Sequence, residues 1–360
     1  MKYIDEYREG EKVRRLAEAI ARQAHRPLRI MEVCGTHTMA IARYGLRQIL
    51  PETIELISGP GCPVCVTSQS DMDRGIGLAQ IPDGLIATFG DMMRVPGSVS
   101  TLAQERARGA DVRVVYSPLD ALRWAEENPR RKVIFLGIGF ETTAPAVGVT
   151  LGEARKRGLR NFWVFSTHKT IPAALRALLD SGETRVDGFL LPGHVSTIIG
   201  SRAYEFLARE YGIACVISGF EPLDILHSIL RLLQQCNEGR PGVEIAYRRG
   251  VTPEGNRKAQ EVMDSVFEAW DAEWRGLGVI PKSGLALRKE WASWDARHSF
   301  PIPVPPALEF RGCRCGEVLR GLIRPTECGL FAKGCMPENP KGPCMVSSEG
   351  SCAAAYKYGR

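Results

Sequence analysis

The sequence predicts an α/β protein with two open parallel sheets of Rossmann-like βα units and a smaller, mostly helical or irregular cysteine-rich region. Three observations support this fold class. From residue 28 to about residue 237, short apolar runs alternate with Gly-rich or polar turns and amphipathic stretches, which is typical of βα units. This alternation stops after residue 238. Six of the 11 cysteines then fall in the last 48 residues.

Eight short apolar runs are the candidate strands. They cover residues 28–33, 53–58, 84–89, 112–116, 132–138, 161–166, 186–191 and 213–218. A helix and turn over 117–131 would close a first unit of four strands, which predicts one domain over 28–128 and a second over 129–238. A single eight-stranded barrel is the alternative, because apolar periodicity does not count sheets.

The two ends of the chain differ from this βα pattern. Residues 1–24 predict a helix with one apolar side, and a further helix is expected near 255–275. A Pro-rich segment, 299–310, separates that helix from the cysteine-rich tail. The tail has little periodicity, and such a segment commonly takes its order from what it binds. We therefore expect a third region over 239–360, joined by the N-terminal helix.

The composition is that of a globular protein, with 44% hydrophobic and 24% charged residues. No apolar stretch approaches the ~20 residues of a membrane helix, and the N-terminus is charged where a signal peptide is apolar. We therefore expect a cytoplasmic protein that does not bind membranes. The net charge of +6 comes without a long basic run, which argues against nucleic-acid binding. In a reducing compartment, clustered cysteines indicate metal binding or redox chemistry.

Polar motifs follow the candidate strands, at the carboxyl edge where α/β sheets build their sites. They are CGTHT, GPGCPVC, FGDMMRVPG, GFETT, STHKT, PGHVS and SGFEP. A single turn of this kind is a weak signal, but seven predict a cleft between the sheets. Taken alone, His168 and His194 are interpreted as turn-capping residues. GIGFETT lacks a nucleotide signature, so Glu141 to Thr143 more simply predict a cap for the next helix.

Cys34 lies at the predicted start of a helix, three residues before His37. A helix N-terminus lowers the pKa of a thiol, which makes Cys34 a candidate nucleophile or soft-metal ligand. A small buried turn residue is the alternative. A cysteine nucleophile also needs an orienting group, and only the fold could bring Asp91, Glu141 or Glu221 to it.

Cys62 and Cys65 have the CxxC spacing of a dithiol–disulfide pair, and Pro63 stiffens the loop that holds them. Redox exchange is the favoured interpretation. A zinc site would need a second close pair, which only Cys313 and Cys315 offer.

Four tail cysteines are separated by 14, 6 and 16 residues: Cys313, Cys328, Cys335 and Cys352. Cys315 and Cys344 are left over. Four thiolates suit a [4Fe–4S] cluster or a tetrahedral zinc, and two more suit an exchangeable disulfide. The spacing alone does not decide which four bind. Cys215 and Cys236 are interpreted as packing residues.

Together, the motifs CGTHT, GPGCPVC, FGDMMRVPG, GFETT and PGHVS and the tail ending in GPCMVSSEGSCAAAY resemble those of the hydrogenase maturation factor HypD family. The resemblance runs from about residue 28 to the C-terminus. One difference is Met39, where some relatives carry a histidine.

The resemblance implies a scaffold and redox component for assembling the Fe(CN)2CO unit of [NiFe]-hydrogenases, more than an enzyme in its own right. It implies that Cys34 shares the iron with a HypC-type chaperone and that a HypE-type partner donates cyanide. The hydrogenase large subunit would then be an indirect partner. The iron would be held only transiently, as cargo.

The resemblance also implies roles for the other cysteines. The ligands of a [4Fe–4S] cluster would be Cys313, Cys328, Cys335 and Cys352. Electrons would pass from it through two dithiols, Cys315 with Cys344 and Cys62 with Cys65. Glu141 and His194 would line the same cleft. His37, by its position three residues from Cys34, is a candidate partner for that thiol. The alternatives are a stand-alone iron–sulfur thiol oxidoreductase and a zinc-stabilised interaction protein.

Overall fold

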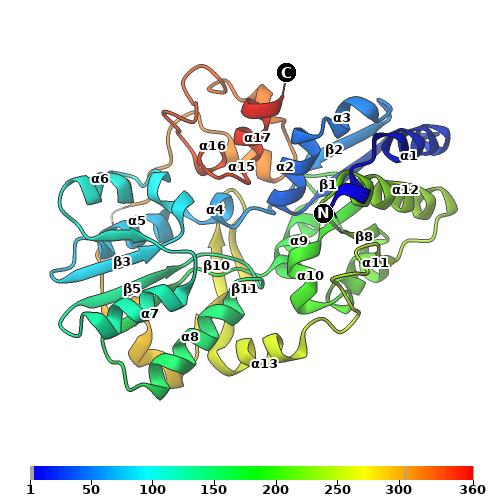
Figure 1. The fold of residues 1–360 in the computed structure, drawn as a ribbon. Coiled ribbons are helices and arrows are strands. Elements are labelled where there is room, and N and C mark those ends of the chain that lie inside the picture. Colours follow the sequence, from blue (N-terminus) through cyan, green and yellow to red (C-terminus); the bar gives the residue numbers. More distant parts are fainter. Residues whose placement is uncertain (1–3, 305, 360) are drawn as a thin grey trace.

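The computed structural model describes residues 4–304 and 306–359, and it contains two open parallel sheets (Figure 1). The five-stranded sheet has the order β2 (Ile54–Ser58), β1 (Leu28–Glu32), β7 (Gly188–Pro192), β8 (Ala214–Ser218), β9 (Val243–Ile245). The four-stranded sheet has the order β4 (Val112–Val114), β3 (Gly84–Thr88), β5 (Lys132–Gly137), β6 (Phe162–Ser166). All their strand pairs are parallel. The α/β class and the eight candidate strands are confirmed, and the barrel is excluded.

The sheets do not follow the chain in consecutive blocks. The five-stranded sheet combines β1 and β2 with β7, β8 and β9, while β3 to β6 form the other sheet. The expected first unit of four strands is therefore divided between both sheets, and the boundary predicted at 128 lies within the four-stranded one. The reason is burial: every residue of β7 is buried, so β7 needs a strand on each side, and β1 supplies one of them.

Helices cover both faces of each sheet. Around the five-stranded sheet lie α1 (Gly10–Gln23), α2 (Gly35–Arg43), α3 (Leu46–Ile49), α9 (Ile171–Asp180), α10 (Gly193–Ile199), η3 (Arg202–Tyr204), α11 (Glu205–Tyr211) and α12 (Pro222–Glu238). Around the four-stranded sheet lie α5 (Gln69–Leu78), η2 (Gly90–Arg94), α6 (Leu102–Ala107), α7 (Pro118–Glu127), α8 (Ala144–Lys156), α13 (Arg257–Val266), η4 (Lys289–Trp294) and α14 (Ala296–Ser299). A short α4 (Pro63–Val66) follows β2.

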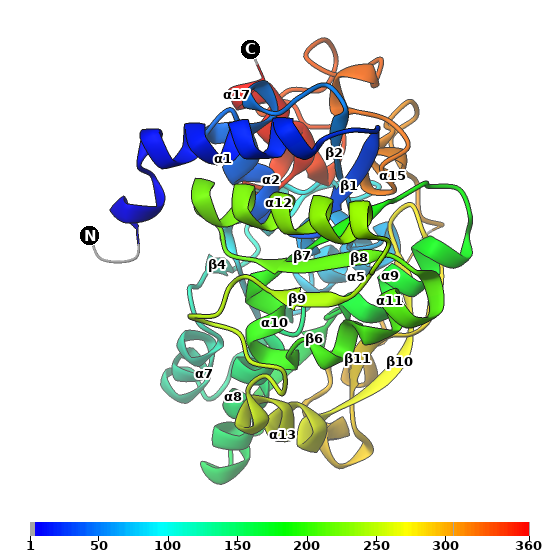
Figure 2. The ribbon, with the colours of Figure 1, turned by 90° about the vertical axis from the view of Figure 1, so that its right-hand side faces the viewer.

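The N-terminal helix belongs to the five-stranded sheet. Its buried Ile20 packs in the same core as Ile225 and Ile229 of α12, and Figure 2 shows α1 and α12 side by side. The prediction that this helix joins the tail is wrong, because its apolar side is used on α12. The expected helix 1–24 begins at Gly10, after the 3-10 turn η1 (Asp5–Tyr7), and its first three positions lie outside the described residues.

The expected helix near 255–275 changes to a strand halfway. α13 ends at Val266, and β10 (Phe267–Trp274) pairs antiparallel with β11 (Gly278–Leu287). Aromatic residues favour strands. Along β10, the half-buried Trp270 and the buried Ala272 and Trp274 stand at every second position, with a shift in the register between Trp270 and Ala272. The apolar residues of this segment therefore follow the two-residue period of a strand.

The cysteine-rich tail folds into short elements between the two sheets, above α4 in Figure 1. They are α15 (Cys315–Leu319), η5 (Pro325–Glu327), α16 (Pro343–Val346) and α17 (Ser351–Tyr358). α17 contacts α2, while α15 and α16 contact α4. The tail therefore covers the loops that carry Cys34, Cys62 and Cys65. Within residues 4–304 and 306–359, no helix combines the length and the apolar character that a membrane crossing requires.

Candidate functional site

The loops after β1 and β2 meet directly. Cys34 ends the first loop as the N-cap of α2, and Gly61 lies in the second. The Gly35 N–H donates to the Gly61 carbonyl at 3.0 Å. A Cβ at Gly61 would lie 2.2 Å from the Cys34 nitrogen, closer than real Cβ contacts come. Only glycine at position 61 allows the CxxC loop to reach Cys34.

The Cys34 thiol is 6% exposed, and burial raises its pKa to about 12. The nearby Glu349 carboxylate acts in the same direction, whereas the backbone N–H groups of His37 and Thr36 lower the pKa. The helix N-terminus does act in the predicted direction, but the expected net lowering of the pKa is wrong, because desolvation outweighs the N–H groups. Cys34 is a neutral thiol at pH 7, and a metal must displace its proton on binding.

Glu32 is a buried carboxyl next to Cys34 that sequence reasoning missed. One oxygen accepts a 2.6 Å hydrogen bond from the Thr38 hydroxyl, and the other faces the Cys34 N–H at 3.4 Å. Burial raises the pKa of Glu32 to about 7. The signal was present, because a carboxyl inside an apolar strand is costly unless the fold uses it.

His37 points away from the Cys34 thiol. Its Nε2 donates to the carbonyl of Gly219, 2.9 Å away, so Nδ1 is left with the lone pair. This Nδ1 is buried without a partner among the described residues, and burial lowers the pKa of His37 to about 4. The His37 ring lies 5.1 Å from Phe220, and the exposed His194 stacks on Phe220 at 3.9 Å. The two histidines thus share one aromatic stack.

Glu141 lies in the same interior and does not cap the helix after it. The N-cap of α8 is Thr143, whose side chain makes no capping bond, whereas Glu141 accepts the Ile171 N–H at the start of α9, at 3.0 Å. Its Oε2 has no partner among the described residues, and burial raises the pKa of Glu141 to about 7. The fully buried Tyr204, which sequence reasoning missed, lies near both Glu141 and Cys34, and burial raises its pKa.

The remaining thiols form a continuous series of contacts. The Cys65 N–H donates to the Cys62 sulfur at 3.2 Å. The Cys65 thiol is in hydrogen-bonding contact with Cys344. Cys344 in turn contacts both Cys315 and Cys352. The structure therefore joins the CxxC pair to the tail cysteines through direct side-chain contacts.

Five tail cysteines line a cavity of about 20 Å³: Cys313, Cys315, Cys328, Cys335 and Cys352. Apolar side chains complete it, among them Leu330 and Phe331. A Cβ at Gly342 would lie 2.6 Å from the Cys313 sulfur, so this glycine leaves the space open. Soft thiols in an apolar setting are the donor set of iron–sulfur and zinc sites.

The donor set suits a metal. Five thiols line the cavity, and a sixth, that of Cys344, contacts two of them. A [4Fe–4S] cluster and a tetrahedral zinc each take four thiolates, so the residues present fit either group.

A tail loop ties the site together. The Ser347 hydroxyl accepts from the Cys62 thiol at 3.4 Å and donates to Asp91 at 3.2 Å. The Thr36 hydroxyl donates to Glu349 at 2.6 Å. Asp91, a candidate partner for Cys34, is thus bonded to the tail. Glu221, the other distant candidate, forms an ion pair with Arg8.

Comparison with known proteins agrees with this geometry. The model of a family described as "HypD: Hydrogenase formation hypA family" matches residues 11–359. The chain belongs to the HypD family. It is 48% identical to the hydrogenase maturation factor HypD of Azotobacter vinelandii over all of this chain and 97% of the relative. The corresponding factor of Escherichia coli is 47% identical over 99% of this chain and 98% of the relative. That of Cupriavidus necator is 47% identical over 100% and 98%.

Membership of the HypD family assigns this chain to hydrogenase maturation. The motifs that carried the resemblance are the ones the fold brings together, since the CGTHT, GPGCPVC and FGDMM loops all contact the tail. Of the cysteines interpreted as packing residues, Cys215 is fully buried in β8 and Cys236 is half-buried on α12.

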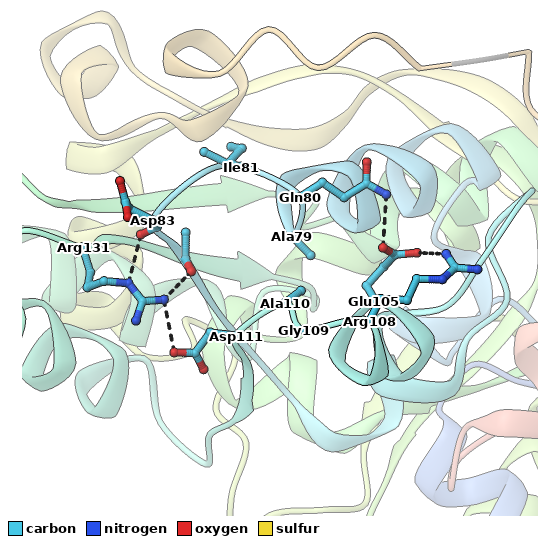
Figure 3. Close-up of a pocket in the computed structure, with 11 residues that line it drawn as sticks. Ala79, Gln80, Ile81, Asp83, Glu105, Arg108, Gly109, Ala110, Asp111 and Arg131 are labelled. Carbon is cyan, nitrogen blue, oxygen red and sulfur yellow. Dashed lines mark hydrogen bonds and ion pairs between the residues drawn. The ribbon is translucent and has the colours of Figure 1, made fainter.

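The opposite edge of this HypD fold carries a groove whose charged residues are mostly paired. It holds about 480 Å³ at the amino ends of β3 and β5, and Figure 3 shows the interactions around Arg131 and around Glu105. Arg131 donates to two backbone carbonyls and pairs with Asp111 at 3.2 Å. Glu105 accepts from Arg108 at 2.6 Å and from Gln80 at 3.2 Å. Of the charged side chains that line the groove, only the Asp83 carboxylate has no partner among the described residues, and it carries the charge that repels an anion.

Proposed function

We propose that this member of the HypD family holds the iron of the Fe(CN)2CO unit on Cys34, together with a HypC-type chaperone, while a HypE-type partner donates cyanide. The observation that supports this proposal is the unbroken series of thiols behind Cys34. It runs from Cys62, on the loop that touches Cys34, through Cys65 to Cys344. An iron that carries cyanide and CO is a soft acceptor, for which a thiolate is an apt ligand.

The four cysteines at positions 313, 328, 335 and 352 would hold a [4Fe–4S] cluster. All four line one cavity with apolar walls, and Cys315 lies on the same wall. When bound, the cluster would supply single electrons to the Cys315–Cys344 pair beside it. Cys344 lies outside that cavity lining and in contact with Cys65, which suits a carrier between the two ends.

Thiol exchange can move two electrons along this series without another reactant. With Cys62–Cys65 oxidised, the Cys344 thiolate attacks the Cys65 sulfur, and Cys62 leaves as a thiolate. Cys315 then attacks Cys344 and releases Cys65. The balance is one disulfide broken and one formed, so Cys62 and Cys65 gain two electrons and Cys315 and Cys344 lose them.

The same geometry argues against the two alternatives. A stand-alone thiol oxidoreductase needs redox thiols that a substrate can reach, whereas Cys62, Cys65 and Cys344 are all buried. A zinc-stabilised interaction protein would leave Cys65 and Cys344 without a reason to touch. The scaffold is therefore the function that the site supports best.

The first test is anaerobic purification followed by absorption and EPR spectroscopy, with iron, zinc and sulfide counted before and after dithionite. We expect four irons per chain and a reducible signal. Zinc without visible absorption would contradict the cluster and the electron path together.

A second test loads the iron unit in the presence of HypC- and HypE-type partners and follows the infrared bands of bound cyanide and CO. Cys34→Ala should abolish these bands, while Cys215→Ala, a matched buried cysteine away from the loops, should keep them. Equal bands in both variants would refute Cys34 as the iron ligand. Cys344→Ser should keep the four-iron signal and lose the reduction of Cys62–Cys65, measured by thiol labelling.

A further inference from the structure

A second cavity lies behind the Cys34 loop, between the five-stranded sheet and the tail. It holds about 420 Å³. One wall is formed by α2, α3 and β2, and the other by η5 and α17, which Figure 1 places beside α2. Cavities of this size commonly bind small molecules, provided that a few polar groups converge on an apolar lining.

Arg47 and Glu52 are the two charged residues of this cavity without a partner among the described residues, and Glu52 stands on the exposed rim. It lines the cavity, its side chain is solvent-accessible, and it makes no hydrogen bond or ion pair within the described residues. Crowding by protein atoms lowers the pKa of Arg47, and the charges that act on it are Glu32 and Arg324. The Glu55 carboxylate does not neutralise it, because its two oxygens accept from Arg29 at 2.8 Å and Arg324 at 3.2 Å.

The rest of the lining is mainly apolar. Leu50, Ile54, Ile323, Ala355 and Tyr358 contribute to it. Hydroxyl and amide groups stand among them, so the cavity combines one free guanidinium with a hydrophobic wall. A guanidinium matches the two oxygens of a carboxylate, and the wall favours an apolar body on the same molecule.

We propose that this cavity binds a small organic anion, a carboxylate on a short aliphatic or aromatic body, with Arg47 holding the carboxylate. Glu52, on the exposed rim, is not among the groups that act on Arg47. The proposal stands on the cavity and its unpaired arginine, and it does not depend on the role of the cysteines.

A ligand here would tie the tail to the sheet. η5 ends directly before Cys328, and Cys352 is the second residue of α17, so both elements of the tail wall lie next to or carry a tail cysteine. On the inner wall, Thr38 and Ser58 hydrogen-bond to Glu32, which lies beside Cys34. A molecule that binds the folded chain alone stabilises it by mass action, so occupancy would stabilise both ends of the site.

The experiment titrates the full chain, purified anaerobically, with hexanoate, benzoate and inorganic phosphate in separate arms. Isothermal titration gives the affinity, and thermal unfolding gives the midpoint. We expect hexanoate or benzoate to bind with a Kd of about 1 mM or tighter and to raise the midpoint. Arg47→Gln should weaken binding by about tenfold or more. Arg43→Gln, the matched control on the outer side of α2, should bind as the parent does.

Two results would overturn the proposal. One is no binding of either acid up to about 10 mM, or equal binding by Arg47→Gln. The other is phosphate binding that exceeds both acids, because a bare anion does not use the apolar wall. Should Arg47→Gln fail to fold, Ala355→Leu fills the apolar part and keeps the arginine. It should abolish hexanoate binding, and unchanged binding would contradict the assigned cavity.

Discussion

The groove at the amino ends of β3 and β5 and the cysteine edge of the molecule differ in volume and in hydrogen bonding. The groove holds about 480 Å³, whereas the cavity among the tail cysteines holds about 20 Å³. In the groove, Arg131 and Glu105 have partners. On the cysteine edge, His37 Nδ1 and Glu141 Oε2 are buried without one among the described residues. Between these two regions, buried polar atoms without a hydrogen bond distinguish the candidate functional site, whereas cavity volume does not.

The comparison has an energetic basis. A buried polar group without a partner costs about 1–3 kcal/mol, so a fold keeps few of them. The two such atoms at the cysteine edge come from α2 and from the loop after β5, and Glu141 and Cys34 both lie near Tyr204. Three further such atoms among the described residues lie elsewhere, on Thr88, His168 and Trp270, so this edge carries two of five and the groove carries none. The following predictions test this contrast, from the largest expected effect to the smallest.

Gly61→Ala should have the largest effect. The new Cβ would lie 2.2 Å from the Cys34 nitrogen and 2.3 Å from the Val33 carbonyl carbon, so backbone must move. We expect a loss of about 3 kcal/mol in the free energy of unfolding and a loss of hydrogenase maturation. Denaturant unfolding and hydrogenase activity in a strain that lacks its own HypD measure the two effects.

The control for that substitution is Gly152→Ala, on the exposed side of α8. A Cβ there meets nothing within 4 Å, so the free energy of unfolding should rise by about 0.5–1 kcal/mol, because alanine favours helices. Similar stability in the two variants would mean that the loops at Cys34 can separate without cost.

Glu141→Gln should change the pH dependence of stability. The folded state holds a proton on Glu141 up to about pH 7, whereas an ordinary carboxyl releases it near 4.5. Between these values, raising the pH therefore destabilises the folded protein, by up to about 1.4 kcal/mol per unit, and the loss is complete above pH 7. The neutral amide removes this loss.

Urea unfolding at pH 5.5 and at pH 7.5 measures that effect. The difference between parent and Glu141→Gln should be smaller or reversed at the higher pH. Glu205→Gln, an exposed control, should leave the pH dependence unchanged. If Glu141→Gln changed the free energy of unfolding by the same amount at both pH values, the Glu141 carboxyl would be ionised in the folded state across that range.

Arg131→Ala in the groove should have the smallest effect. Its bonds to backbone and its pair with Asp111 are partly exposed, so the loss should be about 1 kcal/mol or less. Hydrogenase maturation should stay at the parent level. A loss of hydrogenase maturation without a loss of stability would show that the groove is a functional site. It would contradict the difference described between the groove and the cysteine edge.

Local sequence pattern predicted the strands but not their partners. The eight apolar runs appear as β1 to β8 because each run and the turn after it are short-range features. The return of β7 to the side of β1 depends on contacts between residues near 30 and near 189, which periodicity along the chain does not record. The hairpin of β10 and β11 was missed for a related reason, because apolar residues at 266, 267, 270 and 274 suit a helix as well as a strand.

For the site, residue identity was easier to predict than chemical state. The motifs indicated that Cys34 and the CxxC pair share a site with the tail, and the loops do meet. The pKa of Cys34 was predicted in the wrong direction, because burial depends on the tail loop around Glu349, more than 300 residues away. Tyr204, inside an ordinary helical stretch, carries no signal in the sequence. The ligand set of the cluster and the partners remain predictions.

The packing of the tail over the Cys34 loop also sets an order of events during synthesis. Cys34 emerges from the ribosome more than 300 residues before Cys344, which at 5–20 residues per second is roughly 15–60 s. Through that interval the chain has Cys34, its helix and the Cys62–Cys65 loop but none of the tail cysteines that later cover them. A nascent chain therefore cannot hold the site in its finished form. The site is therefore complete only after translation ends, because the segment that covers Cys34 is synthesised last.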